Sequence, residues 1–359
     1  MRSSCNIYIG YGLLSALLFG AGTQLSKLML TSVPPVTMAG LIYMGSGLGL
    51  LIMTSLMSFA GRERSEARLS RRDIPWLLGT MLFGTLLAPI TLMFGLTYTP
   101  AATAALLLNF EGVATTIVAV LWVREPVGRR MWAALALIVT SCMLLSYRPD
   151  AIYGISFGAL GVLLACSFWG IDNNVIQKLS GKNPITIVML KGLCMGTVVF
   201  LISRFLGEAM PEPWQILAGM AIGFLFIGGL MSTCLMLAIR GLGSARGAAI
   251  LSLSPFFGVV FAFLLSDDLP GEHFLLAFII MVAGSYLLLT EKHCHEHTHP
   301  ALTHEHRHRH DDLHHDHIHS PDDPPIGPAG YHSHVHTHET LTHTHPHSPD
   351  IHHRHVHGK

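Results

Sequence analysis

Long apolar runs alternate with short polar loops along residues 1–290. Runs such as 36–59 and 101–123 are nearly uncharged, and each is about long enough to cross the roughly 30 Å hydrocarbon core of a bilayer as a helix. The alternation repeats ten times, which predicts an all-α integral membrane protein with ten transmembrane helices. The predicted spans are residues 8–28, 36–59, 75–96, 101–123, 131–147, 153–173, 185–206, 213–237, 244–266 and 273–290.

Composition distinguishes residues 1–290 from residues 291–359. Of 359 residues, 50% are hydrophobic and 12% are charged, whereas soluble domains carry about 25% charged residues. Lys and Arg exceed Asp and Glu by five in residues 1–290 and fall short by five in residues 291–359. The six cysteines contain no CxxC pair and most lie in apolar runs, so we expect buried free thiols.

The basic residues predict how the chain lies across the membrane. Short loops rich in Lys and Arg stay in the cytoplasm. If the N-terminus is inside, the cytoplasmic loops hold twelve Lys and Arg residues and the opposite loops hold two, Arg148 and Arg204. We therefore predict that both termini are cytoplasmic, that the first span is retained rather than cleaved as a signal peptide, and that Lys27 anchors its end at the interface.

The chain also resembles itself. Residues 119–128 (AVLWVREPVG) correspond to residues 262–271 (AFLLSDDLPG) at an offset of 143, and residues 17–27 (LLFGAGTQLSK) correspond to residues 167–177 (SFWGIDNNVIQ) at an offset of 150. Two halves of five spans insert with opposite orientation, because five is odd. We expect an inverted repeat of residues 1–147 and 148–290, with the substrate site near the midplane between the halves.

Three runs carry a resemblance to a known family. They are TPAATAALLLNFEGVATTIVAVLWVREP (99–126), GSARGAAILSLSPFFGVVFAFLLSDDLP (243–270) and WGIDNNVIQKLS (169–180). In these runs the chain resembles the EamA-type ten-helix permeases of the drug/metabolite transporter superfamily, including a branch with His-rich tails. The resemblance implies a secondary transporter and a proline in the middle of the fourth span of each half. Pro255 matches that proline, whereas the first half has Phe110, Glu111 and Gly112 there.

Glu111 is the most informative residue of the membrane part. It is the eleventh of the 23 residues in the span 101–123, so it lies near the bilayer centre. An acid at that depth costs about 2.5–3.5 kcal/mol on insertion scales, and such residues usually serve function. We predict that Glu111 and the nearby Asn109 line the transport pathway, with a proton or a cationic substrate exchanging on the carboxylate. The structural alternative is a protonated or paired acid that holds two helices together.

Four further polar residues lie in or at the end of apolar spans. Lys191 lies about two turns inside the seventh span, where it snorkels to the surface, pairs with Glu111 or Asp172, or binds an anionic group of the substrate. Asp172, Asn173 and Asn174 end the sixth span, where they either line the pathway or act as helix-end residues.

Residues 291–359 form a His-rich tail that cannot build a core, because large apolar residues are sparse and seven prolines interrupt it. We expect a disordered cytoplasmic tail without ligand. Its His-X-His repeats (HEHTH, HEHRHRH, HSHVHTH, HTHPH, HHRHVH) place alternate side chains on one side of an extended chain, so three or four imidazoles can gather around one ion. The predicted ligands are His304, His306, His308, His310, His314, His315, His317, His319, His332, His334, His336, His338, His343, His345, His347, His352, His353, His355 and His357.

Neutral imidazole suits Zn²⁺, Ni²⁺, Co²⁺ and Cu²⁺, and the sequence does not choose among them. Binding requires deprotonated imidazole, so it weakens as pH falls below about 6.5. The alternative is a low-complexity tract that senses pH through its own charge. No cofactor is expected in the membrane part.

Two functions compete for the whole protein. The first is an exporter of a small metabolite or drug-like compound whose tail buffers metal or gates transport, and the second is a divalent metal transporter whose tail collects the ion. We prefer the exporter, because a metal path needs several ligands at midplane depth and spans one to nine contain no histidine. A membrane sensor that transports nothing is a third interpretation.

The absence of a GxxxxGK[ST] motif, of a catalytic triad and of paired carboxylates argues against an ATP-driven pump and against an enzyme. The expected partners are a small-molecule substrate, the lipid bilayer and divalent metal ions, with a homodimer allowed and no nucleic acid. We expect the protein in a bacterial or archaeal cytoplasmic membrane.

Overall fold

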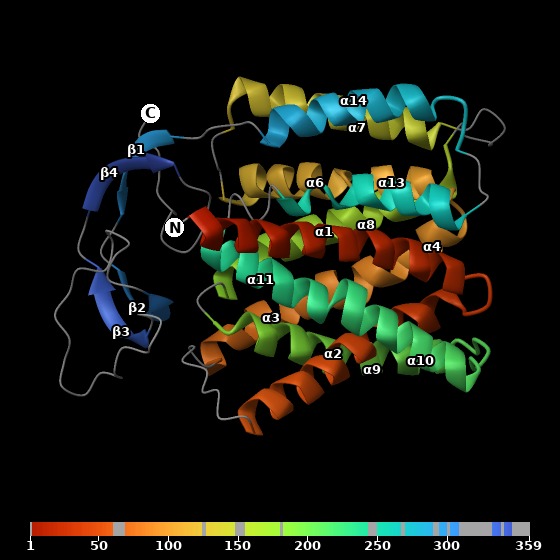
Figure 1. The fold of residues 1–359 in the computed structure, drawn as a ribbon, viewed down its shortest axis with the longest axis horizontal. Coiled ribbons are helices and arrows are strands. Elements are labelled where there is room, and N and C mark those ends of the chain that lie inside the picture. Colours follow the sequence, from red (N-terminus) through yellow and green to blue (C-terminus); the bar gives the residue numbers. More distant parts are fainter. Residues whose placement is uncertain are drawn as a thin grey trace.

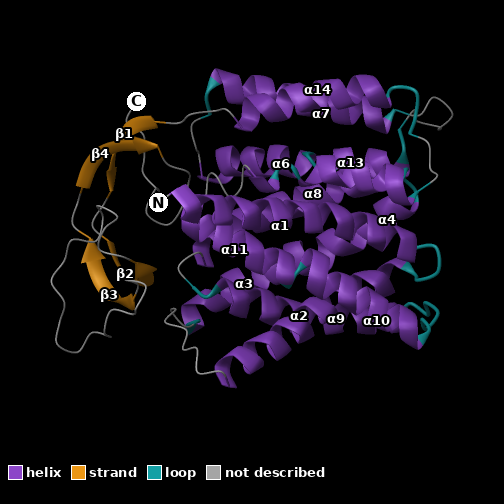
Figure 2. Cartoon of the chain, viewed as in Figure 1, coloured by secondary structure: helices purple, strands orange, loops and turns teal. Residues whose placement is uncertain are grey.

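The computed structural model describes residues 2–59, 69–123, 127–147, 155–179, 182–242, 250–266 and 270–289 of the membrane part. In the tail it describes residues 294–299, 302–308, 332–338 and 341–346. Helices lie side by side in one bundle, and the strands of the tail lie beside one end of it (Figures 1 and 2).

The first five spans begin with α1 (Arg2–Met29) and α2 (Pro35–Phe59). The third span is built from η1 (Arg71–Asp73), α3 (Ile74–Thr80), η2 (Met81–Leu87) and α4 (Ala88–Thr97). The fourth comprises α5 (Ala101–Leu107), α6 (Phe110–Val118) and η3 (Ala119–Val123), and the fifth is α7 (Arg129–Ser146).

The second five spans begin with α8 (Phe157–Ile176), continued by η4 (Gln177–Leu179), and with α9 (Pro184–Phe205). The third of these spans contains α10 (Pro213–Ile222), η5 (Gly223–Ile227) and α11 (Leu230–Leu242). The last two are α13 (Ser254–Leu265) and α14 (Phe274–Leu289).

Helical segments thus occupy every predicted span, although residues 244–249 of the ninth lie outside the described part. Within the described residues, seven helical segments are long and apolar enough to cross a membrane, and Ser254–Leu265 and Phe274–Leu288 are shorter apolar helices. Local signals set several starts: Ser156 caps α8 through the Ala159 N–H, and Asn183 caps α9 through the N–H groups of Ile185 and Thr186.

The helices alternate in direction, so α1 begins and α14 ends on the same side of the bundle (Figure 1). The described ends of α2, η3, η4 and α11 lie at that side too, and the loops predicted to be cytoplasmic follow them in the chain (Figure 1). Their described basic residues are Arg71, Arg72, Arg129, Arg130, Lys178 and Lys182. The structure therefore gathers at one end the basic residues on which the orientation prediction depends.

The helix contacts correspond between the two sets of five spans: a helix of one set contacts the counterparts of the helices that its own counterpart contacts. Helix α1 packs against α11 and α13, and its counterpart α8 packs against α4 and α6. Two further pairs join counterparts directly, namely α2 with α9 and α7 with α14. The α2–α9 pair is antiparallel, because Gly40 approaches Phe200 whereas Gly47 approaches Leu193.

Glycines make these close approaches possible. A Cβ atom on Gly45 would lie 2.1 Å from the Met220 carbonyl oxygen, and one on Gly223 would lie 1.9 Å from that of Ile42. Both contacts are to backbone, which cannot move aside as a side chain can. In lipid, small residues let helix backbones approach and pack. The high glycine content of the spans therefore serves helix packing.

Four segments of the tail form short strands. Strand β1 (Cys294–His299) pairs antiparallel with β4 (Leu341–Pro346), and β2 (Leu302–His308) pairs antiparallel with β3 (His332–His338). Alternation with period two and β-branched Thr and Val favour an extended backbone in these segments. Figure 2 shows these strands apart from the helices.

We predict that Gly45→Ala lowers stability by about 1–3 kcal/mol, because the added methyl group displaces the α10 backbone. Gly10→Ala is the matched control, since a Cβ there meets nothing within 4 Å, and it should be neutral or stabilising by about 0.5–1 kcal/mol. Thermal unfolding in detergent, followed by tryptophan fluorescence, measures both. Equal melting temperatures for the two variants would contradict the close α2–α10 packing.

Candidate functional site

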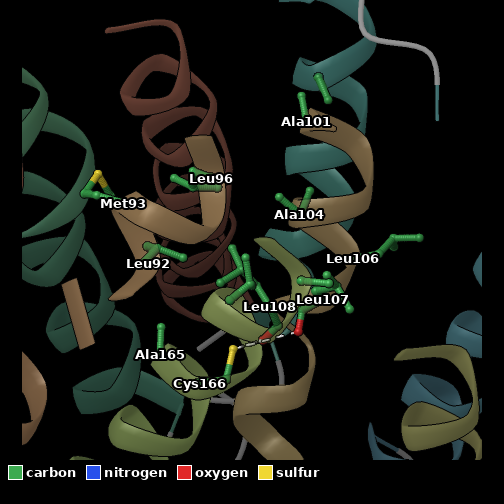
Figure 3. Close-up of a cluster of buried hydrophobic side chains, with 14 of the residues drawn as sticks. Leu92, Met93, Leu96, Ala101, Ala104, Leu106, Leu107, Leu108, Ala165 and Cys166 are labelled. Atoms are coloured by element: carbon green, nitrogen blue, oxygen red, sulfur yellow. Dashed lines mark hydrogen bonds between the residues drawn. The ribbon is translucent and has the colours of Figure 1, made fainter. Parts of the chain in front are cut away.

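The fourth span is interrupted near its middle. Helix α5 ends at Leu107 and α6 begins at Phe110, and across this break the Glu111 N–H donates to the Leu108 carbonyl at 3.1 Å instead of to that of Leu107. The Cys166 Sγ lies 3.8 Å from the carbonyl oxygens of both Leu107 and Leu108, as the dashed lines in Figure 3 show. A thiol from α8 thus satisfies backbone groups that the break would leave unpaired in lipid.

The side chain of Asn109 bonds within its own span at this break. Its Nδ2 donates to the Leu106 carbonyl at 3.3 Å, three residues earlier in the same span. Its predicted place in the transport pathway therefore has no support beyond its position beside Glu111.

Glu111 lies in the first turn of α6 and contacts α8. The Asn173 Nδ2 donates to the Glu111 Oε1 at 2.9 Å and also lies 3.1 Å from the Thr115 Oγ1. All three residues are half-buried. Among the described residues no cation pairs with Glu111, so its hydrogen bond comes from a neutral amide.

Asn174 joins the same two helices through backbone. Its Nδ2 donates to the carbonyls of Thr115 at 3.0 Å and Gly170 at 2.8 Å. The approach is close, because a Cβ atom on Gly170 would lie 2.7 Å from the Ala114 carbonyl carbon. Asn173 and Asn174 lie in the last turn of α8, before its C-cap residue Gln177. Each donates a side-chain hydrogen bond across to α6.

Lys191 pairs with Asp172, which decides among the alternatives for this lysine. Its Nζ lies 3.0 Å from Oδ2 and 3.3 Å from Oδ1 of Asp172, and the two residues are 8% and 7% exposed. The lysine neither snorkels to the surface nor pairs with Glu111. The pair joins α8 to α9 and cancels two charges that would each be costly in lipid.

The carbonyl of Gly84 is a feature of the site that sequence reasoning missed. Gly84 lies in η2, a π-helical turn, where its oxygen accepts hydrogen bonds from the Tyr43 hydroxyl and the Trp169 Nε1, each at 3.2 Å. A Cβ atom on Gly84 would lie 1.9 Å from the Asp172 Oδ2, so only glycine fits beside the ion pair. Single π-turns often mark functional sites. Trp169, three residues before Asp172 in α8, is the signal that could have drawn attention here.

The site is therefore shared between the two sets of five spans. Tyr43, Gly84, Glu111 and Thr115 come from the first set, and residues 169–174 with Lys191 come from the second. The arrangement places one carboxylate with amide and hydroxyl neighbours next to a neutralised ion pair and two aromatic side chains.

Polar contacts join the two sets at both ends of the bundle as well. At one end Glu208 accepts hydrogen bonds from the backbone N–H groups of Val36 and Thr37 and from the Thr37 hydroxyl, at 3.1, 2.7 and 2.7 Å. The carboxylate thereby caps the start of α2 from the α9–α10 loop. At the other end the Lys182 Nζ lies 3.3 Å from the Asp73 Oδ2, just before α9 and α3.

The predicted metal ligands divide between described and undescribed parts of the tail. Those in strands are His304, His306, His308, His332, His334, His336, His338, His343 and His345. Those outside the described residues are His310, His314, His315, His317, His319, His347, His352, His353, His355 and His357. Within the described part, no three His, Cys, Asp or Glu residues are already gathered to hold a metal ion.

The comparisons with known proteins agree with this structure, which is a bundle of apolar helices with a polar cluster between its two sets of spans. The EamA-like transporter family matches the chain twice, over residues 6–147 and 156–290. A membrane transporter is thus the class of protein that sequence and fold define, and the resemblance and fold class expected from the sequence are confirmed. The chain belongs to the EamA-like transporter family.

Two similar proteins add detail. A protein of Methanothermobacter thermautotrophicus (strain ATCC 29096 / DSM 1053 / JCM 10044 / NBRC 100330 / Delta H), named as an uncharacterized transporter, is 28% identical over 287 residues, covering 76% of this chain and 83% of that protein. A protein of known crystal structure superimposes with a TM-score of 0.55 and 17% identity, covering 78% of this chain and 95% of that one. This second likeness concerns the fold alone.

We predict that Lys191→Met destabilises the protein by about 3–5 kcal/mol, because it leaves a buried carboxylate unpaired. The double variant Lys191→Met with Asp172→Asn should recover most of this loss. Melting temperatures of the two single variants and the double variant measure the coupling. Additive losses in the double variant would show that the two groups do not form a pair.

Proposed function

We propose that the protein is a secondary transporter that exports a small metabolite or drug-like compound, with the substrate exchanging against a proton at Glu111. The observation that carries the proposal is the surroundings of this acid: it lies midway along a broken span, between the two sets of helices, with a neutral amide as its donor. Broken helices between repeats are the usual place of substrate sites in secondary transporters.

Charge balance explains why exchange is the natural chemistry of this site. Asp172 and Lys191 neutralise each other, so the net charge of the cluster follows the state of Glu111. In a medium of low dielectric constant a lone carboxylate is unfavourable, and either a proton or a cationic group relieves it. The two cannot occupy one carboxylate together, which couples their movements in opposite directions.

The two matching sets of helices provide the motion. As an inverted repeat, they would exchange conformations when the pathway changes the side to which it opens. The Glu208 contact with α2 closes one end and the Asp73–Lys182 pair closes the other. Each contact would break in turn during a transport cycle.

The proposal includes the location and the tail. The basic end of the bundle would face the cytoplasm of a bacterial or archaeal cell, which places both termini and the tail inside. The tail would bind Zn²⁺, Ni²⁺ or Co²⁺ and act as a buffer or as a gate on export, and the protein would work as a monomer or a homodimer in the bilayer.

Divalent metal transport is the second candidate, because the tail could pass ions to the pathway. The neighbours of Glu111 weigh against it: one carboxylate with the side chains of Asn173 and Thr115 supplies fewer ligands than the roughly four to eight that a divalent ion takes. Comparing full-length protein with residues 1–290 for metal content and tolerance in cells separates the two functions.

We predict that Glu111→Gln lowers proton-coupled transport at least tenfold, because glutamine cannot exchange a proton. Proteoliposomes that enclose a pH-sensitive dye are exposed to a panel of organic cations, amino acids and sugars, and proton movement is recorded for each compound. Glu212→Gln is the matched control, since Glu212 caps α10 away from the cluster, and it should retain wild-type activity. Unchanged proton movement in Glu111→Gln would remove the coupling from this residue.

We also predict the effect of a covalent link in a double variant with Thr37→Cys and Glu208→Cys. Joining the two cysteines with a short bifunctional thiol reagent should stop transport, because the end of the bundle at which Glu208 contacts α2 can no longer open. Reduction of the link should restore activity. The same treatment of each single cysteine variant is the control. Continued transport by fully linked protein would show that this contact does not open in the cycle.

A further inference from the structure

The paired strands of the tail place histidine opposite histidine. In the β2–β3 pair, His304 lies opposite His336, His306 opposite His334 and His308 opposite His332. In the β1–β4 pair, His295 lies opposite His345 and His297 opposite His343. We call these two pairs of strands the histidine ladders, and each opposed His–His position a rung.

The two-residue period of a strand puts all rungs of one ladder on the same face. The other face of the β2–β3 ladder holds Thr303 opposite Thr337, Glu305 opposite Val335 and Arg307 opposite Ser333. The pairing register matters, because a slip of one residue would move every histidine of one strand to the other face. The observed register is therefore one that opposes imidazoles to imidazoles.

Ladder spacing fits a metal ion. Opposed residues have Cβ atoms about 4.5–5.5 Å apart, and successive rungs are about 6.5–7 Å apart along the strand. Zinc binds imidazole nitrogen at about 2.0–2.1 Å with four ligands in a tetrahedron. Two neighbouring rungs therefore place four histidines at backbone spacings that fit four ligands of one ion.

We propose that each histidine ladder is a divalent-metal site in which two neighbouring rungs supply four imidazole ligands, so that metal binding and strand pairing are one event. This rests on the metal-binding tail of the proposed function and assigns its ligands. The β2–β3 ladder has three rungs and the β1–β4 ladder has two, so both can hold an ion with four ligands. Zn²⁺ and Ni²⁺ are the expected ions.

Strands β2 and β3 lie between β1 and β4 in the chain, so metal binding to the ladders would fold the tail back on itself. The outer strands β1 and β4 pair around the inner strands β2 and β3. An ion on the β1–β4 ladder therefore ties together segments more than forty residues apart in the chain, and an ion on the β2–β3 ladder ties together segments more than twenty residues apart. Strand β1 begins five residues after the end of α14. The metal-loaded tail would be folded close to the end of the bundle at which α14 ends.

The first test measures Zn²⁺ binding to the full-length protein in detergent at neutral pH by calorimetry. Removing one side of the β2–β3 ladder, with His304, His306 and His308 all replaced by Ala, should abolish one tight site. The matched control replaces Thr303, Glu305 and Arg307, which lie on the other face of β2, by Ala and should keep all tight sites. Equal losses in the two variants would overturn the ladder sites while leaving a metal-binding tail.

The second test measures pairing directly. Spin labels at Thr303→Cys and Thr337→Cys, on the face without histidine, report the distance between β2 and β3 in a background with Cys5, Cys194 and Cys294 replaced by Ser. With Zn²⁺ the distance should become short and narrowly distributed, and EDTA should broaden it. A pair at Thr303→Cys and Ser333→Cys should give a distance longer by roughly 10 Å, because Ser333 lies four residues away from Thr337.

The outcomes separate the two levels of the proposal. Tight Zn²⁺ binding without a change in the Thr303–Thr337 distance would overturn the ladders and leave the tail as an unstructured metal buffer. No Zn²⁺ or Ni²⁺ binding by the full-length protein would overturn both the ladders and the metal role of the tail, without bearing on transport at Glu111.

Discussion

The membrane part depends on one constraint, which is that backbone polar groups placed in lipid must find partners within the protein. The break at Leu108–Asn109 releases carbonyl groups, and Cys166 and Asn109 take them up. The same break turns the start of α6 toward α8, where Asn173 donates to Glu111. The ion pair of Asp172 and Lys191 then ties α8 to α9, so one interruption organises the centre of the bundle.

The two halves share a fold but not a chemistry. Gly20 lies in close contact with α13, as Gly170 does with α6. A second break lies at Ser252–Leu253, directly before α13 begins at Ser254. By the alignment of the repeats, however, Gly22 stands where the other half has Asp172, and Ser254 stands where it has Glu111. Matching packing is what the proposed alternation of the two halves requires, and the charged groups of Glu111, Asp172 and Lys191 mark the combination of helices at which exchange is proposed.

Much of this arrangement could be predicted from the sequence, because it follows from local pattern. Length and hydropathy give the spans, and the cost of an acid at midplane depth singles out Glu111. The partner of Lys191 could not be chosen, since it depends on how α8 and α9 lie together. Tyr43 and the Gly84 carbonyl were missed because a π-turn leaves no mark in the sequence. In the tail, the His-X-His alternation predicts extended chain, but the pairing register is a property of two segments at once.

The central claim is that the polar cluster around Glu111 lies on a pathway that opens to each side of the membrane in turn. The most direct measurement is the reactivity of Thr115→Cys toward a membrane-impermeant thiol reagent, in sealed vesicles treated from one side or the other. The account predicts modification from both sides, faster from one side when a pH gradient is applied and slower when a transported compound is present. Modification from one side only, or from neither, would contradict it.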